Sequence, residues 1–197
     1  MDKKVYYNYV HTTKLDIDID KMRESCGYMY SLVNKNFSKN KLDFNEQSTP
    51  VTQLFASYNL LMYPFDGFHE LYEGIRKEFR ELGLEGNYYI QCWLNYYNEG
   101  QCIDWHDHWD EDCCSWHGYY CVDVEPSKTT YRIEGLPELD IISENNLLVL
   151  SPSGKDKHRT WPWHDKTRPR VTIAFDILPG NIIDPNNNFN LNHWVPL

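Results

Sequence analysis

The sequence predicts an α+β fold, mainly β, in which a helical N-terminal part precedes a β-rich C-terminal half. Two observations carry this prediction. Between Asp66 and Leu82, apolar residues recur at three- and four-residue steps, the period of a helix that buries one face. After Gly86 the chain changes to short aromatic and β-branched runs that are separated by turn residues. Several short strands at close spacing are typical of a β-sandwich or a β-barrel.

The expected elements follow in order along the chain. A strand-like segment at residues 5–11 leads to a helix opening at 19–22, and the polar residues 34–49 are expected to form a loop. The amphipathic helix ends at Gly83, since glycine commonly terminates helices. Strands are then expected at residues 88–97, 118–124, 129–133, 139–142, 147–150 and 171–178.

The length of 197 residues fits a single domain with a substantial core. We divide this domain into a mixed helical support region (1–85), a β-rich core (86–178) and a C-terminal wrapping tail (179–197). Hydrophobic residues make up 41% of the chain and aromatic residues 15%, which is the composition of a globular protein and not of a disordered one.

Charge and composition argue against several classes of protein. The formal net charge of −10 argues against a nucleic-acid partner, because phosphate-binding proteins carry dense Lys/Arg patches. No run of 18 apolar residues is present, which argues against a membrane span, and the N-terminus lacks the apolar core of a signal peptide. The six cysteines form no CxxC pair and are expected to be reduced thiols. The sequence therefore predicts a cytoplasmic protein.

Four of the eight histidines lie in one part of the chain, at positions 106, 108, 117 and 158. Neutral imidazole is a good ligand for iron, zinc or copper. In an extended segment, residues i and i+2 point to the same side, so that His106 and His108 can both reach one ion. His158 follows an apolar strand and can supply a third ligand. Taken alone, this spacing is equally compatible with a solvated or hydrogen-bonded histidine cluster.

Two longer motifs surround these histidines. The first is Asn95-Tyr96-Tyr97-Asn98-Glu99-Gly100-Gln101-Cys102-Ile103-Asp104-Trp105-His106, and the second comprises Leu147-Leu148-Val149-Leu150-Ser151-Pro152, His158 and the strand opened by Arg170. Together they closely resemble the 2-oxoglutarate- and Fe(II)-dependent dioxygenases. These enzymes carry an Asn-x-Tyr-x-x-Gly strand and turn, a first metal histidine, a distal histidine and an arginine that opens the next strand. The resemblance covers roughly residues 88–178.

The resemblance implies a double-stranded β-helix (jelly-roll, cupin-like) core with helices packed on one side. His106 would be the first ligand of Fe(II) and His158 the last. Arg170 would pair with the distal carboxylate of 2-oxoglutarate, since its planar fork suits bidentate binding of a carboxylate. Asn95 and Tyr97 match residues that hydrogen-bond the cosubstrate in the AlkB-type members.

The activity that the resemblance implies is hydroxylation. In this family O2 and 2-oxoglutarate are consumed together, 2-oxoglutarate is decarboxylated to succinate, and a C–H bond of the substrate is hydroxylated. Analogy of this kind supports the reaction class and does not name the substrate. We therefore expect a small-molecule or protein substrate of unspecified structure.

One departure from the family pattern concerns the metal ligands. His108 stands two residues after the first ligand, where most members have Asp. Either the site uses three histidines, His106, His108 and His158, or the pair is shifted to His108 and Asp110. A three-histidine site is also natural for a cupin-like metal dioxygenase, or for a metal-binding protein that does not use 2-oxoglutarate.

A second departure concerns the substrate. At the end of the strand that Arg170 opens, Asp176 stands where the AlkB-type demethylases have another Arg. Together with the negative net charge, this argues against nucleic-acid demethylation. Tryptophans flank the candidate ligands at positions 105, 109, 116, 161 and 163. They fit an aromatic wall for a planar or apolar substrate, and they equally fit ordinary packing around a small barrel.

Overall fold

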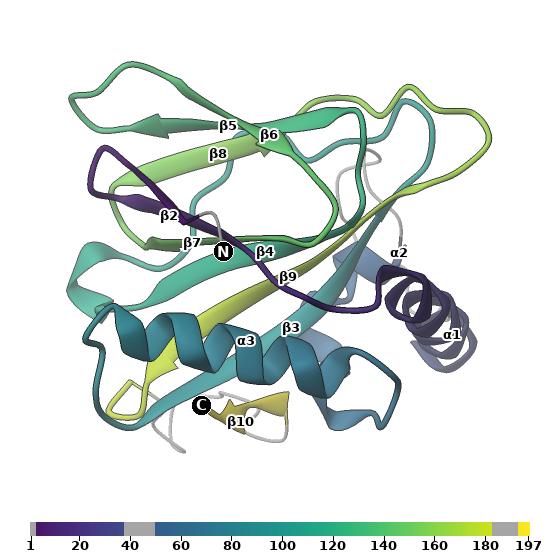
Figure 1. Ribbon diagram of the computed structural model, residues 1–197, viewed down its shortest axis with the longest axis horizontal. Coiled ribbons are helices and arrows are strands. Elements are labelled where there is room, and N and C mark those ends of the chain that lie inside the picture. Colours follow the sequence, from purple (N-terminus) through teal and green to yellow (C-terminus); the bar gives the residue numbers. More distant parts are fainter. Residues whose placement is uncertain (1–2, 38–49, 183–192) are drawn as a thin grey trace.

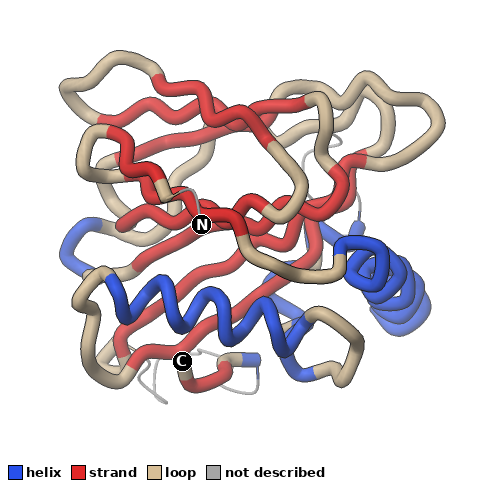
Figure 2. Tube along the Cα trace, viewed as in Figure 1, coloured by secondary structure: helices blue, strands red, loops and turns tan. Residues whose placement is uncertain are grey.

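The computed structural model describes residues 3–37, 50–182 and 193–197, and its strands form two antiparallel sheets (Figures 1 and 2). The large sheet contains, from one edge to the other, β1 (Lys4–Tyr6), β2 (Val10–Lys14), β7 (Leu147–Pro152), β4 (Trp116–Asp123), β9 (Arg170–Pro179), β3 (Tyr88–Tyr97) and β10 (Val195–Pro196). The small sheet contains β6 (Leu139–Ser143), β5 (Ser127–Ile133) and β8 (Asp156–Thr160).

Helices cover one face of the large sheet (Figure 1). They are α1 (Ile19–Phe37), α2 (Pro50–Gln53) and α3 (Phe68–Glu81). Short 3₁₀ turns occur at Phe55–Ser57, Leu60–Met62 and Glu111–Cys113. The Phe79 ring of α3 meets Tyr88 of β3 edge-on at 4.8 Å, and Tyr30 of α1 stacks on Tyr96 of the same strand at 4.1 Å. Tyr88 and Tyr96 are an even number of residues apart, so both helices lie on the same side of β3.

Strands β3 and β9 pair along their whole length, and their two faces differ in character. On the helix side the facing pairs are apolar: Ile90–Ile177, Cys92–Phe175 and Leu94–Ile173. On the other side they include polar and charged pairs: Gln91–Asp176, Asn95–Thr172 and Tyr97–Arg170. This second face shares a cavity with Thr129 and Thr160 of the small sheet, so the polar side chains are enclosed between the sheets.

The predicted fold class is confirmed: the chain is α+β, mainly β, with helices packed on one side of a two-sheet core. The amphipathic helix predicted at 66–82 is α3. Its end is set by Gly83, which takes a left-handed φ of 76° and donates its N–H to the Arg80 carbonyl at 2.9 Å. No helix in the described ranges is long and apolar enough to cross a membrane.

Two expectations need correction, and one strand was not expected. The segment at 5–11 is a hairpin and not one strand, because Tyr7 and Asn8 take left-handed φ values of 54° and 52° and reverse the chain between β1 and β2. Helix α1 continues through residues 34–37, where a loop was expected, while 38–49 lie outside the described residues. Strand β8 is not predicted by the sequence pattern. In the expected wrapping tail, β10 pairs with β3, and residues 183–192 lie outside the described residues.

Candidate functional site

Two of the candidate ligands are held together by backbone pairing. His106 follows β3 in sequence and forms an isolated antiparallel bridge with His158 of β8. Each of the two residues donates its backbone N–H to the carbonyl of the other, at 3.1 and 3.0 Å. Directly paired residues project to the same face of a sheet, and the two imidazole centroids lie 4.3 Å apart.

His108 completes a cluster with these two residues. One ring nitrogen from each of His106, His108 and His158 lies within 4.8 Å of the others, so the three could hold one ion. Asp110, the alternative ligand, is exposed and belongs to neither group of described residues with this geometry. The arrangement therefore brings together the three-histidine set and leaves Asp110 at the edge of the site.

The Nδ1 atom of each of these imidazoles faces an oxygen atom. The partner of His106 is the Asp104 carbonyl at 2.9 Å, that of His108 is Asp176 Oδ1 at 2.7 Å, and that of His158 is Asp156 Oδ2 at 3.3 Å. An Nδ1–H donated to these oxygens leaves the lone pair on Nε2 for a metal. Carboxylates behind ligating histidines fix ring orientation and raise ligand basicity. The donor set therefore fits a metal ion.

Asp156 connects this cluster to a fourth histidine. The buried Asp156 carboxylate accepts hydrogen bonds from Tyr9 Oη at 3.1 Å and from His117 Nε2 at 3.2 Å, in addition to its contact with His158. His117 Nε2 also lies 3.1 Å from Ser151 Oγ. His117, Asp156 and His158 form a second buried group with spacing that suits a metal, and the two groups share His158.

Burial and charge set the protonation of the cluster. Burial lowers the pKa of His106 to about 4 and that of His158 well below its usual value, so both rings stay neutral at pH 7, as metal ligation requires. Burial also opposes the charged forms of His108 and Asp176. Their mutual attraction outweighs this, so that the pKa of His108 is raised and that of Asp176 is lowered.

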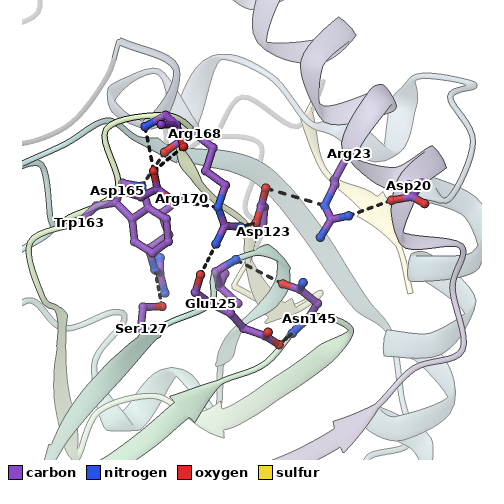
Figure 3. Close-up of polar contacts among 12 residues, drawn as sticks. Asp20, Arg23, Asp123, Glu125, Ser127, Asn145, Trp163, Asp165, Arg168 and Arg170 are labelled. Atoms are coloured by element: carbon purple, nitrogen blue, oxygen red, sulfur yellow. Dashed lines mark hydrogen bonds and ion pairs between the residues drawn. The ribbon is translucent and has the colours of Figure 1, made fainter.

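Arg170, at the start of β9, is a buried cation that lacks a carboxylate partner within the described chain. Only 2% of its surface is exposed, and its Nε donates to Ser127 Oγ at 3.1 Å (Figure 3). The nearby carboxylates are taken by Arg168, which pairs with Asp123 and, at 3.0 Å, with Asp165. A buried guanidinium is costly unless it is paired, so this end of the site suits an anion.

One cavity of about 780 Å³ contains both the histidine cluster and Arg170. Its floor is the inner face of β9, where Arg170, Thr172, Ala174 and Asp176 follow one another at every second position. Asn95, on the neighbouring strand, also lines the cavity, and its buried Oδ1 makes no hydrogen bond with the described residues.

Tyr97 has a different position from Asn95. It is fully buried opposite Arg170 in the β3–β9 register and is not among the residues that line the cavity. Burial raises the pKa of its hydroxyl, which therefore stays protonated. A direct contact of Tyr97 with a cosubstrate stays a prediction.

Asp156, and the role of Asp176, were missed by reasoning from the sequence. Asp156 stands two residues before His158 on the same strand, and this Asp-x-His spacing on an extended segment was an available signal. Asp176 was noted only as a departure from a family pattern. Its contact with His108 joins residues that are 68 positions apart by their numbering, and no local pattern shows such a contact.

Neither a protein-family model nor a curated protein matches the sequence. Solved structures do match. A prolyl hydroxylase from Trichoplax adhaerens, solved with a hypoxia inducible factor oxygen degradation domain peptide fragment, is 13% identical over 89% of this chain and 86% of its own, with a TM-score of 0.64. A prolyl-4-hydroxylase from Pseudomonas putida is 13% identical over 87% and 92% of the two chains, with a TM-score of 0.55.

AviO1 from Streptomyces viridochromogenes is 11% identical over 90% of each chain, with a TM-score of 0.56. At such low identity these likenesses show the fold alone. The chain therefore has the double-stranded β-helix fold of the 2-oxoglutarate- and Fe(II)-dependent oxygenases, and the structural resemblance expected from its motifs is confirmed. Within that fold it carries a buried cluster of histidines and carboxylates that could hold a metal.

Proposed function

We propose that this protein is an Fe(II)- and 2-oxoglutarate-dependent oxygenase that hydroxylates its substrate. One observation carries the proposal: a single cavity has three clustered imidazoles at one end and, at the other, a buried arginine without a carboxylate partner among the described residues. The first feature suits a metal ion. The second suits the free carboxylate of a dicarboxylic cosubstrate that chelates the metal through its other end.

In this proposal His106, His108 and His158 hold Fe(II) through Nε2. With Fe(II), 2-oxoglutarate and O2 bound, the site supplies the chemistry of its class, in which decarboxylation to succinate and CO2 is coupled to hydroxylation of a C–H bond. Three neutral ligands leave the ion with one more positive charge than a set that includes a carboxylate. The Asp176 carboxylate, in contact with His108, returns a negative charge to the immediate surroundings.

The cavity-lining residues also have roles in binding. Arg170 receives the distal carboxylate of 2-oxoglutarate on its guanidinium, which Ser127 orients through Nε. Asn95 offers to the same ligand its amide N–H groups and a side-chain oxygen that has no hydrogen-bond partner within residues 3–37, 50–182 and 193–197. Burial of Arg170 strengthens its contact with the carboxylate.

A second candidate function is a cupin-like three-histidine metal dioxygenase or metal-binding protein that does not use 2-oxoglutarate. The observation that favours it is His108 in place of a carboxylate ligand. Arg170 has no role in this alternative, so binding of 2-oxoglutarate separates the two candidates.

The test measures metal and cosubstrate binding separately. We expect the purified protein to bind Fe(II) or Ni(II) under anaerobic conditions, to bind 2-oxoglutarate once the metal is present, and to form succinate with Fe(II) and O2. Arg170→Ala should weaken 2-oxoglutarate binding by about 100-fold while leaving metal affinity unchanged, because it removes the buried counter-charge of the carboxylate.

Arg170→Met, which keeps most of the side-chain volume, guards against a folding defect. Arg132→Ala is the matched control, since Arg132 is exposed, pairs with Glu138 and lies outside the cavity lining. Metal binding without any 2-oxoglutarate binding would favour the second candidate. A protein that binds neither Fe(II) nor Ni(II) would contradict both.

A further inference from the structure

We propose that the substrate of this oxygenase carries a cationic amine or guanidinium group, which Asp110 holds at the cavity mouth while the apolar stem lies along an aromatic wall that leads to the metal centre. This inference rests on the proposed function and adds the substrate class to it. Three features of the described residues support it: the aromatic wall, the charges that line the cavity, and the exposure of the groups at its mouth.

The aromatic wall consists of Phe55 and Trp93. Their ring centroids are 5.5 Å apart, and the Trp93 ring is stacked 6.5 Å from the imidazole of His108. Phe55 is 40% exposed whereas Trp93 is 8% exposed. The wall therefore runs from solvent to a candidate metal ligand, and an apolar chain placed along it would reach the metal centre.

Most of the charged residues that line the cavity are acidic, namely Asp107, Asp110 and Asp176. The basic residue Arg170 lies at the far end. Asp107 pairs with Lys157 at 3.1 Å, and Asp176 pairs with His108 and accepts from Trp109 Nε1 at 3.1 Å. Asp110 differs, because its carboxylate has no ion-pair or hydrogen-bond partner within the part of the chain that the structure describes.

Binding of the cosubstrate increases the effect of this excess of acidic residues in the cavity. Fe(II) and the 2-oxoglutarate dianion together add no net charge to the cavity, and the positive charge of Arg170 stays at the far end, beside the distal carboxylate. The carboxylates of Asp110 and Asp176 then remain on the substrate side of the cavity, in a protein with a net charge of −10. This field attracts a cation and repels an anionic substrate.

The position of Asp110 determines how the cation would bind. Asp110 is exposed, so a cationic group beside it keeps part of its hydration and avoids most of the cost of burying a charge. Amines and guanidinium groups on alkyl stems combine a hydrated charge with an apolar chain, which suits an exposed carboxylate and an aromatic wall that line one cavity. The carbon presented to the metal is then several bonds away from the charge.

The experiment compares cationic ligands with neutral analogues of the same shape. Isothermal titration calorimetry on Ni(II)- and 2-oxoglutarate-loaded protein would use two pairs of probes. One pair is Nα-acetyl-lysine methylamide with Nα-acetyl-6-hydroxynorleucine methylamide, and the other is pentylammonium with 1-pentanol. We expect the cation of at least one pair to bind roughly 3- to 10-fold more tightly than its neutral partner, with the difference falling as salt is added.

Variants assign that preference to a residue. Asp110→Asn should abolish most of the difference within a pair, while Asp112→Asn should leave it unchanged, because Asp112 is an exposed carboxylate of the same turn that does not line the cavity. A preference confined to the lysine pair indicates a peptide substrate, and one confined to the pentylammonium pair indicates a free small molecule.

Equal affinity within both pairs, no binding of any probe, or a preference that survives Asp110→Asn would overturn the inference. The same titrations report Ni(II) and 2-oxoglutarate binding before any probe is added. If those two ligands bind and the cationic preference is absent, the proposed oxygenase function stands and only the substrate class fails.

Discussion

The two faces of the β3–β9 pair share one backbone and one set of hydrogen bonds, yet they contribute to the protein in opposite ways. The helix-facing side is apolar and fully packed, and it stabilises the fold. The cavity-facing side holds a buried arginine that has no carboxylate partner in the described part of the chain, and a carboxylate that contacts a histidine. Polar groups are costly to bury, so apolar side chains on the second face would stabilise the fold better than the polar ones that are present. The proposed binding of a metal and a cosubstrate accounts for the composition of this face.

The largest effect is expected on the helix-facing side. Phe175→Ala should lower the free energy of unfolding by about 3–5 kcal/mol, because it removes a fully buried ring and leaves a cavity between β9 and its neighbours. Denaturant titration followed by circular dichroism measures the change. Thr172→Val, on the cavity-facing side of the same strand, is the matched control and should stay within about 1 kcal/mol of the wild type. Equal losses in the two variants would remove the proposed difference between the faces.

The next effect concerns the choice between the two overlapping ligand groups. His108→Ala should weaken Ni(II) or Co(II) binding by about 100-fold or more, because it removes one of three ligands, whereas His117→Ala should cost about tenfold through loss of support for Asp156. Metal titrations of both variants at one pH, together with the cobalt absorption spectrum, separate the two. A larger loss of metal affinity in His117→Ala than in His108→Ala would indicate that the metal binds to the group of His117, Asp156 and His158.

The smallest of these effects concerns the carboxylates beside the ligands. Asp176→Asn and Asp156→Asn should each reduce metal affinity by roughly 10- to 100-fold, since each removes the charge that orients an imidazole. The cobalt spectrum should shift as well, which a purely structural role would not cause. Asp107→Asn is the control, because Asp107 lines the cavity but pairs with a lysine and not with a ligand. An effect of Asp107→Asn as large as the other two would assign the change to net charge alone.

Sequence predicts the apolar part of this architecture well and the polar part less well. Helix α3 and strands β3 and β9 follow from apolar residues at the expected periods, and their boundaries agree within about two residues. Strand β8 is not detected because its buried positions are the polar residues Asp156 and His158. Its alternation of buried and exposed positions therefore does not appear as an alternation of apolar and polar residues. The pattern for a buried strand assumes apolar side chains, and it fails where the site replaces them.

The candidate site shows the same division. Spacing and family resemblance select His106, His108, His158 and Arg170, and the structure places all four around one cavity. The choice between His108 and Asp110 depends on how the chain turns after His106, which the sequence does not specify. The two departures from the family pattern, at His108 and Asp176, are in contact. His108 stands where the family pattern has a carboxylate, and the carboxylate of Asp176 lies against its ring.

The backbone bridge between His106 and His158 has a consequence for rates. Reciprocal hydrogen bonds from backbone N–H to carbonyl join the two residues, and the Thr160 N–H donates a further bond to the Ile103 carbonyl. Backbone hydrogen bonds therefore hold residues 103–106 against β8. An ion held by both imidazoles could depart only after one ligand swings away or this segment peels from the strand. The residence time of the metal would then follow the opening frequency of a few backbone bonds, and amide hydrogen exchange at these positions would slow on metal loading.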